Sequence, residues 1–257
     1  MSEPSSSSTH PSTTNSNNNT NNGFDQALLT DTYQITMTYA HWKMNKHNDN
    51  VNFEIFFRSN PFHNGQYTIF TGLQDCLHHV RTTFCFTNDD ITYLQSTPAC
   101  HHMEPEFFEY LQSIPTSNLS SLQIQAIPEG TMVFPREPLM IIQGPLGICQ
   151  LLETTFLNLI NFSSLITTNA CRMVIAANAQ HPSSCVEFGL RRAQGPDGAM
   201  TATKYCYIGG FNATSNVLGG KLYDIPIVGT HAHSYIQSFL SLEEVQHSTL
   251  YNQNTDQ

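Results

Sequence analysis

The 257-residue sequence is poor in basic residues and lacks long apolar runs. Ten Lys and Arg stand against twenty Asp and Glu, which gives a formal net charge of −10. A general nucleic-acid binder needs a basic face, so the composition argues against that class. No apolar run approaches the roughly 18 residues of a membrane span, so we expect no membrane partner. The seven cysteines are scattered without a C-x-x-C pair, which indicates reduced thiols in the cytosol and no disulfide framework.

The first residues form a polar tail. Residues 2–22 contain 17 Ser, Thr or Asn and no Lys or Arg. Such a segment cannot bury apolar surface, so we expect residues 1–23 to be disordered. The tail has neither the basic nor the apolar region of a secretory signal, and without Arg it is a poor mitochondrial transit peptide. We therefore expect a cytoplasmic protein.

Residues 24–145 are predicted to form an α+β sandwich domain with a boundary near Gly144-Pro145. The patterns predict helices over residues 32–45, 72–80, 89–95 and 105–113, and strands over 51–58, 122–127 and 132–142. Pro135 and Pro138 prevent the last run from being one unbroken central strand. The adjacent pairs His78-His79 and His101-His102 have diverging side chains, so we expect solvated surface and no joint metal ligation.

Residues 146–240 are predicted to alternate helices and strands. The apolar stretch 146–179 reads as two helices broken at Asn161-Phe162-Ser163. A strand at 186–189, a helix over 199–208 capped by Asp197, a helix over 215–222 closed by Gly219-Gly220, and a β-branched run at 225–228 follow. This alternation indicates a mainly parallel layout, in which polar groups at the carboxyl ends of strands share one site. Those groups are Glu187, Arg191, Arg192, Thr230, His231 and His233.

The predicted fold class is therefore α/β: an α+β sandwich followed by the first part of an incomplete β/α-barrel-like domain. A complete (β/α)₈ barrel needs about 250 residues, and fewer than half of these follow Gly147. We expect residues 241–257 to be a truncated loop or tail. A fragment, a truncated gene model or a short isoform would each account for this length.

Three groups of residues carry candidate chemistry. His231 and His233 would share one face of an extended strand. They are either metal ligands, which needs a third ligand that nothing in the sequence marks, or a nucleophile that accepts a phosphoryl group from ATP. Arg191 and Arg192 match phosphate or carboxylate geometry, although a surface ion pair is the more general interpretation. Tyr33 is either a core or capping-turn residue or a ring that stacks on a flat substrate.

Several long motifs resemble the nicotinate phosphoribosyltransferase family. They are EFGLRRAQGPDG (187–198), YIGGFNATSN (207–216), GT-x-AHS (229–234), LLTD-x-YQ (28–34), FEIFFR (53–58), PEG (128–130) and LLET (151–154). Together they span most of residues 24–240. Several motifs in the family's order are far more specific than any single pattern.

The resemblance implies a reaction in NAD biosynthesis. Nicotinate joins 5-phosphoribosyl 1-diphosphate to give nicotinate mononucleotide and diphosphate, coupled to ATP hydrolysis through phosphorylated His233. Tyr33 would lie against the pyridine ring, contributed by the neighbouring subunit of a homodimer, and Thr230 would contact nicotinate. We assign Arg191, Arg192 and Ser234 to the anionic groups. His231 matches the variable x position and receives no role. Mg²⁺ or Mn²⁺ is implied by the polyphosphate substrates, without metal ligands assigned in the chain.

Two alternatives remain open. The protein could be a phosphoribosyltransferase for another pyridine, such as nicotinamide or quinolinate. It could also be a catalytically inactive truncated fragment or isoform that acts by pairing with a full-length subunit.

Overall fold

The computed structural model describes residues 26–60, 65–114, 121–178 and 184–244. The tail predicted to be disordered, residues 1–23, lies outside the described residues. So does most of the segment predicted as a truncated loop, residues 241–257.

The described chain mixes helices and strands, as the predicted α/β class requires. The helices are α1 (Thr32–Lys43), α2 (Leu73–His78), α3 (Asn88–Ser96), α4 (Pro105–Ser113), α5 (Leu146–Asn178), α6 (Gly195–Ile208), α7 (Val217–Tyr223) and α8 (His233–Gln237). The strands are β1 (Asn50–Ile55), β2 (Thr68–Ile69), β3 (Gln123–Ala126), β4 (Met132–Val133), β5 (Met140–Pro145), β6 (Val186–Glu187) and β7 (Ala213–Thr214). A π-helical turn, η1 (His79–Thr83), and two 3₁₀ turns, η2 (Leu190–Arg192) and η3 (Leu242–Glu244), complete the order.

The N-terminal half contains an antiparallel sheet with the order β1-β5-β3. Ile142 of β5 pairs with Phe53 of β1 and with Ile124 of β3. Alternate side chains of β1 turn inward, which confirms the period-2 pattern predicted for this strand. Pro135 and Pro138 lie between β4 and β5, because a proline has no N–H to give to a ladder.

Local sequence signals define the short helices of this half. Asp90 and Thr87 form a capping box at the start of α3: the Asp90 backbone N–H donates to Thr87 Oγ1 at 3.2 Å, and the Thr87 N–H donates to Asp90 Oδ2 at 2.8 Å. Pro105 begins α4, as predicted. Phe107, Phe108 and Leu111 of α4 are buried in the core, and burial of each such side chain contributes about 1.5–3 kcal/mol.

The expectation that both histidine pairs are solvated is wrong for His79. His79 is buried, its ring packs against Phe84, and its Nδ1 lies 2.8 Å from Thr83 Oγ1. It begins the π-helical turn η1, whose wider backbone turns this residue toward the core. His101 and His102 are exposed, as expected.

The apolar stretch after β5 forms one continuous helix, α5, where two helices were expected. Asn161-Phe162-Ser163 does not break it. Ser163 Oγ donates to the Leu159 carbonyl one turn earlier and also to the Thr71 carbonyl at 3.0 Å. Because the Ser163 hydroxyl is satisfied by the helix itself and by Thr71, and Asn161 is exposed, neither residue needs a loop.

By length and composition alone, α5 is apolar enough to cross a membrane, and 33% of its most apolar window is buried. Core helices of folded domains pass the same test. Thr71 N–H donates to Ser164 Oγ at 3.1 Å, and the Ile69 N–H donates to Thr168 Oγ1 at 2.8 Å. These buried polar contacts are typical of a core helix. The absence of a membrane partner stays a prediction.

The C-terminal half has the predicted parallel layout. β6 pairs with β7 in parallel, and Thr214 of β7 forms a parallel bridge with Ile227. Glycines 219 and 220 lie inside α7 and do not close it; the helix ends at Asp224, which has φ 53°. A Cβ on Gly220 would overlap Cγ2 of Ile227, so the glycine serves close packing.

The expected cap of α6 is also wrong. Gln194 occupies the N-cap position, and Asp197 lies inside the first turn. Its carboxylate there still favours the helix through the macrodipole.

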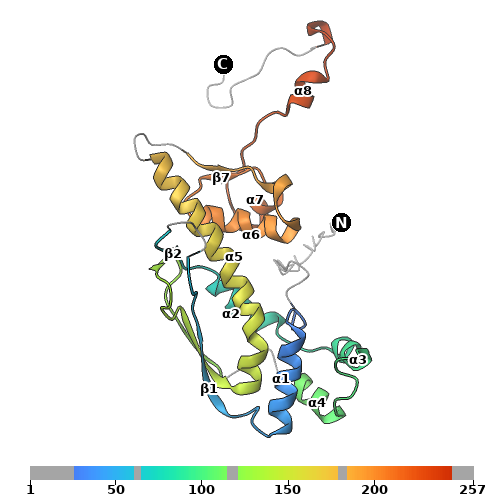
Figure 1. The fold of residues 1–257 in the computed structure, drawn as a ribbon. Coiled ribbons are helices and arrows are strands. Elements are labelled where there is room, and N and C mark those ends of the chain that lie inside the picture. The colour runs from blue at the N-terminus through green and yellow to red at the C-terminus, as the bar shows by residue number, and fades with distance from the viewer. Residues whose placement is uncertain (1–25, 61–64, 115–120, 179–183, 245–257) are drawn as a thin grey trace, which may run out of the picture.

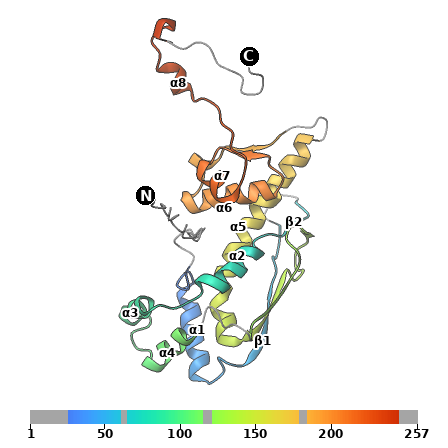
Figure 2. The ribbon, with the colours of Figure 1, turned by 180° about the vertical axis from the view of Figure 1, so that it is seen from behind.

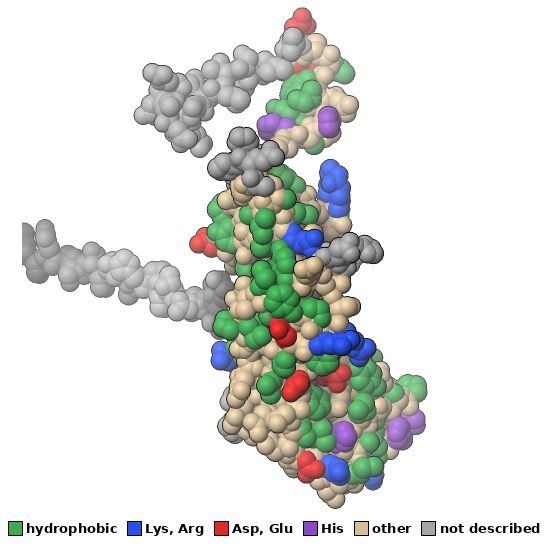
Figure 3. Space-filling view, turned by 60° about the vertical axis from the view of Figure 1, so that its left-hand side comes forward, with side chains coloured by type: hydrophobic (Ala, Val, Ile, Leu, Met, Phe, Trp, Pro, Cys, Tyr) green, Lys and Arg blue, Asp and Glu red, His purple; other side chains and the backbone are tan. Residues whose placement is uncertain are grey.

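Helix α5 runs along the molecule and contacts both halves (Figures 1 and 2). Its first part packs between α1 and the β1-β5-β3 sheet, and its last part packs on α6. The short helix α8 projects from the far end, away from α1 (Figure 1). On the face seen in Figure 3, acidic and basic side chains are scattered and form no large field of one sign.

Candidate functional site

Tyr33 lies in the first turn of α1 and is 47% exposed. Its side chain lines a cavity of about 450 Å³ between α1, the end of β1 and the middle of α5. Phe56 and Leu157 give this cavity apolar walls, and Asn158 and Asn161 add amide groups. A flat ring could stack on Tyr33 with its polar substituent toward the amides. This exposure excludes the core-tyrosine interpretation.

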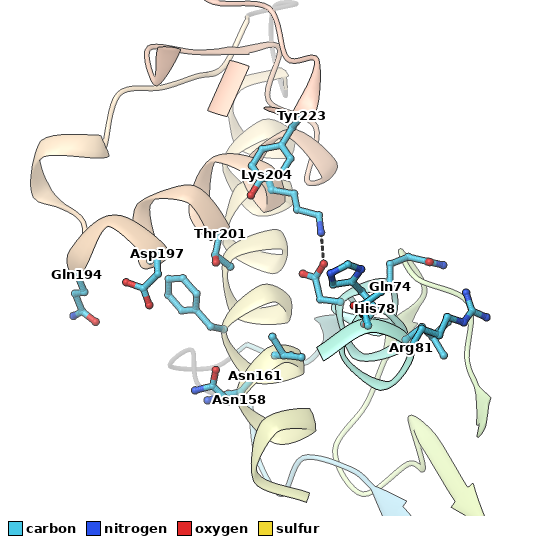
Figure 4. A pocket seen from close by; sticks show the side chains of 16 residues that line it. Gln74, His78, Arg81, Asn158, Asn161, Gln194, Asp197, Thr201, Lys204 and Tyr223 are labelled. Atoms are coloured by element: carbon cyan, nitrogen blue, oxygen red, sulfur yellow. Dashed lines mark hydrogen bonds and ion pairs between the residues drawn. The ribbon is translucent and has the colours of Figure 1, made fainter. Parts of the chain in front are cut away.

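A larger cavity, of about 780 Å³, lies between α2, α5 and α6 (Figure 4). Lys204 of α6 points toward Asp75 of α2, with Nζ 2.5 Å from Oδ1. Tyr205 donates its hydroxyl proton to Asp75 Oδ2 at 2.6 Å. Burial and the Asp75 carboxylate raise the pKa of Tyr205, so this hydroxyl stays a donor. These contacts join α6 to the N-terminal half.

Charges of both signs line this larger cavity. Arg81 and His78 come from η1 and α2, whereas Asp197 comes from the start of α6 (Figure 4). Asn158 and Asn161 project from α5 and line both cavities, so the two are neighbours. Because the acidic and basic groups offset each other, this cavity does not select a phosphate group by charge alone.

Glu187, at the end of β6, is buried, and both of its carboxylate oxygens accept hydrogen bonds. Its Oε2 accepts from Thr214 Oγ1 at 2.7 Å and from Thr203 Oγ1 at 3.2 Å, and its Oε1 accepts from the Gly189 N–H. The sequence analysis included Glu187 among the polar groups expected to share one site. The structure shows that it fixes the turn that precedes η2. Burial, with a smaller effect of Glu187, also raises the pKa of the Cys206 thiol to about 12.

Arg191 and Arg192 occupy η2, directly after that turn. Both are exposed, and among the described residues neither guanidinium has a hydrogen bond or ion pair. The surface-ion-pair interpretation therefore finds no partner in the described chain. Their five-donor forks are available to an anion from solvent.

The GT-x-AHS segment does not form the extended strand that was expected. Ala232 is extended, and His233 begins the short helix α8. Thr230, His231, His233 and Ser234 are all exposed, and the His231 ring stacks on Tyr235 at a centroid distance of 5.1 Å. The two histidines therefore do not share a strand face. A β-branched run ends at Val228, and no ladder continues beyond the Ile227 bridge in the described residues.

The structure places some of the predicted site residues after parallel elements of the C-terminal half and separates Tyr33 from them in space. Arg191 and Arg192 follow β6, and Thr230, His233 and Ser234 follow the Ile227 bridge, so the two groups come after parallel elements on either side of β7. Tyr33 lies at the start of α1, and α1 and α8 are well separated in both views (Figures 1 and 2). Within one chain, Tyr33 and His233 do not form one site.

A resident divalent metal ion has no evident protein site in the described chain. Among the described residues, no group of three or more His, Cys, Asp or Glu is arranged to hold an ion. Mg²⁺ usually keeps several waters and binds substrate phosphates with few protein ligands. The residues present therefore do not fit a preformed metal centre, and no chemical step below depends on one.

Sequence reasoning missed several residues that shape the cavities. Asn161 was assigned to a helix break, although it lines both cavities from an unbroken helix. Asp75 and Lys204 carried no signal, because they are 129 positions apart and only the fold brings them together. Glu153 stands inside the LLET motif, but nothing in the sequence indicated its partner.

Comparisons with known proteins show which family this chain resembles. Residues 28–161 match the family model of the nicotinate phosphoribosyltransferase (NAPRTase) N-terminal domain. A nicotinate phosphoribosyltransferase of Caenorhabditis elegans is 52% identical over 239 residues, covering 92% of this chain and 41% of the relative. Nicotinate phosphoribosyltransferase 2 of Arabidopsis thaliana is 50% identical over 218 residues, covering 85% and 38%.

Solved structures show the same relationship. The crystal structure of human nicotinic acid phosphoribosyltransferase matches with a TM-score of 0.73 and 42% identity, over 82% of this chain and 40% of that one. A nicotinate-nucleotide pyrophosphorylase of Pyrococcus furiosus shares the fold, with a TM-score of 0.62 and 22% identity, over 85% of this chain and 45% of that one. The chain spans about two fifths of the length of the curated relatives it matches. With a family model covering more than half of its residues and close relatives aligned across most of it, the chain belongs to the nicotinate phosphoribosyltransferase family.

Proposed function

We propose that this chain forms part of an enzyme that joins nicotinate to 5-phosphoribosyl 1-diphosphate, yielding nicotinate mononucleotide and diphosphate. The observation that carries the proposal is the identity of up to 52% to proteins named for this activity, over regions that include Tyr33 and the GT-x-AHS segment. The exposed Tyr33 ring beside an amide-lined cavity adds physical support, because it suits a flat heteroaromatic acid.

In this reaction the lone pair of the pyridine nitrogen forms a bond to the anomeric carbon. The bond from that carbon to diphosphate breaks, and its electron pair leaves with diphosphate. Positive charge develops on the ribose, so the site has to hold anionic groups in place and keep water away. Arg191 and Arg192 are suited to the anionic groups, because their side chains are exposed and have no partner among the described residues. Thr230 and Ser234 offer hydroxyl groups to nicotinate and phosphate.

His233 is the proposed link to ATP. The lone pair of an imidazole nitrogen forms a bond to the γ-phosphorus as the bond to the ADP oxygen breaks, and water later releases the phosphoryl group as phosphate. His233 is exposed, and its ring has no hydrogen bond to a described residue, so a nucleotide can reach it. Mg²⁺ would enter with the polyphosphates and offset their charge. A cytoplasmic location fits the reduced cysteines.

A homodimer with shared active sites would bring Tyr33 of one chain close to His233 of the other. Helix α1, which bears Tyr33, and helix α8, which begins at His233, lie far apart within one chain (Figure 1). A second copy, packed in the opposite direction, would place its Tyr33 beside this chain's η2 and α8. Two equivalent sites would then form across one two-fold axis.

The substrate assignment is tested by supplying purified enzyme with nicotinate, nicotinamide or quinolinate, together with 5-phosphoribosyl 1-diphosphate, ATP and Mg²⁺. We expect nicotinate mononucleotide to form only from nicotinate. Turnover of another base without turnover of nicotinate would reject the proposal and select the alternative pyridine.

The role of His233 is tested with γ-labelled ATP. We expect acid-labile label on the wild-type chain and none on His233→Ala, with ATP stimulation of turnover lost. His231→Ala serves as the matched control and should keep the label. Unchanged ATP stimulation in His233→Ala would contradict the assignment.

A second proposal concerns the 257-residue polypeptide by itself. The described residues contain one parallel strand pair and one bridge, and Val217, Leu218 and Ile227 are exposed beside them. Such an apolar surface suits packing against further chain or a full-length subunit. We expect this polypeptide alone not to turn over nicotinate. Measurable nicotinate mononucleotide in that assay would show the expectation to be wrong.

A further inference from the structure

We propose that Glu153 is a positioning residue that sets the direction of the Tyr33 ring. This inference rests on the proposed function, in which Tyr33 meets the pyridine ring. The Tyr33 hydroxyl lies 3.4 Å from Glu153 Oε1, so it has one carboxylate acceptor on α5. That distance is long for an O–H···O bond, and such contacts often tighten when the site is occupied.

Glu153 is itself held by buried amides. Gln150, one turn earlier on α5, donates from Nε2 to Glu153 Oε2 at 3.1 Å. The same Nε2 donates to Gln34 Oε1 on α1. Gln34 and Gln150 are almost completely buried, at 0% and 4% exposed. Because a buried amide without partners is costly, these bonds fix the carboxylate that Tyr33 faces.

Further hydrogen bonds connect the start of α1 to α5. Gln34 Nε2 donates to Thr154 Oγ1 at 3.2 Å, and Thr154 Oγ1 donates to Asp31 Oδ2 at 3.0 Å. Thr155 Oγ1 also bonds to the Leu29 carbonyl, just before α1. Asp31, Tyr33 and Gln34 at the start of α1 are thereby hydrogen-bonded to residues 150–155 of α5. Tyr33 lines the open cavity, together with Asp31 and Thr154.

The physical consequence concerns ring order. Tyr33 is 47% exposed, so apolar packing alone does not hold its ring. Fixing a mobile side chain opposes binding unless the free protein has already fixed it. The contact between the Tyr33 hydroxyl and the Glu153 carboxylate restricts the ring and leaves its stacking face open to nicotinate. Its removal should therefore weaken nicotinate binding and leave the binding of 5-phosphoribosyl 1-diphosphate unchanged.

The first test measures ring order in the 257-residue chain by ¹⁹F NMR with 3-fluorotyrosine. The Tyr33 resonance is assigned by its loss in Tyr33→Phe. Glu153→Ala should move it toward the position of the free amino acid. Glu109→Ala, an exposed residue of α4 without a described side-chain contact, should leave it unchanged. An unmoved Tyr33 resonance in folded Glu153→Ala would overturn the inference.

The second test uses the intact enzyme that carries these residues. Glu153→Ala should raise KM for nicotinate about fivefold, the usual effect of one lost hydrogen bond, with kcat and KM for 5-phosphoribosyl 1-diphosphate unchanged. Tyr33→Phe should have the same effect, and the double variant should be no worse than either, because one contact is removed in each case. Glu153→Gln keeps an acceptor oxygen and should recover part of the loss. Additive effects, or an unchanged KM in Tyr33→Phe, would overturn the inference.

These results separate the two proposals. If wild-type enzyme does not use nicotinate, or if Tyr33→Ala is as active as wild type, the proposed function of this site fails. If Tyr33→Ala is impaired but Glu153→Ala and Tyr33→Phe are not, the site is correct and only the positioning role is rejected.

Discussion

The Lys204 ammonium lies 2.5 Å from Asp75 Oδ1, and the two residues join α6 to α2 beside the larger cavity. Tyr205 completes the group by donating to the other carboxylate oxygen. One carboxylate therefore serves two donors on adjacent residues of α6. The Lys204 Nζ also lies 5.0 Å from the centre of the Tyr205 ring, within the range of a cation–π contact.

Removal of this carboxylate should cost more than removal of the ammonium. Asp75→Ala leaves the Tyr205 hydroxyl and the lysine without an acceptor, so we expect a loss of about 2–3 kcal/mol in the free energy of unfolding. Lys204→Met keeps the alkyl chain and the Tyr205 bond, so we expect about 1 kcal/mol or less. Urea denaturation measures both. Glu109→Ala should stay within about 0.5 kcal/mol of wild type. A larger loss in Lys204→Met than in Asp75→Ala would contradict this account.

The buried Tyr205 should make the protein sensitive to alkaline pH. Burial, followed by the Asp75 carboxylate, raises its pKa above the ordinary value of 10.0. The folded chain then holds a proton that the unfolded chain releases, so this stability is fully present below pH 10 and is lost as pH rises. We expect the urea midpoint to fall between pH 9 and about pH 11, and to fall less steeply in Tyr205→Phe. Burial also raises the pKa values of Tyr110, Tyr223, Cys149 and Cys206, and these groups account for a slope that remains. Equal slopes in the two proteins would contradict the prediction.

Two glycines with positive φ should respond differently to alanine. Gly72 has φ 102°, and a Cβ there would lie 2.5 Å from Ser163 Oγ and 2.7 Å from the Leu159 carbonyl. Gly130 has φ 85°, but a Cβ there would meet no atom within 4 Å. Gly130→Ala carries only the conformational cost, about 1 kcal/mol, whereas Gly72→Ala adds overpacking against α5 and should lose about 3 kcal/mol. Thermal unfolding compares them. Equal losses would show that the contact with α5 is not tight.

Glu104 should titrate at unusually low pH. A hydrogen bond from Lys43, followed by one from Tyr39, lowers its pKa to about 2. Since the folded pKa is depressed, the contribution is present above the ordinary value of 4.5 and is lost as pH falls toward 2. An NMR titration of the side-chain carboxyl measures this. Lys43→Met should move the midpoint back toward the ordinary value, and an unchanged midpoint would rule out the ion pair as the cause.

Local patterns predicted the elements of the N-terminal half well. The alternation in β1, the proline that begins α4 and the prolines between β4 and β5 act through neighbouring residues, so a single sequence reveals them. The helix break at Asn161 was wrong for a tertiary reason. Polar side chains of α5 are satisfied by Thr71 and by the helix's own carbonyls, and a sequence does not display these partners.

In the candidate site, too, features set by local signals were predicted correctly, and features set by tertiary contacts were not. Tyr33 was placed correctly in the first turn of α1 because helix and cap signals are local. Glycines 219 and 220 were taken as a helix stop, although they allow α7 to approach Ile227. The His231–His233 pair was assigned to a strand because an H-x-H pattern fits one. The backbone at Ala232 leads instead into a helix of five residues.

The uninterrupted course of α5 has a mechanical consequence. A helix of 33 residues is about 50 Å long, and its first turns hold the start of α1 while its last turns support α6. Because α5 is continuous and bends little, a tilt of one end of this helix also displaces its other end. A displacement of the start of α1 should therefore be transmitted along α5 to α6 and to the adjoining turn η2, which bears Arg191 and Arg192.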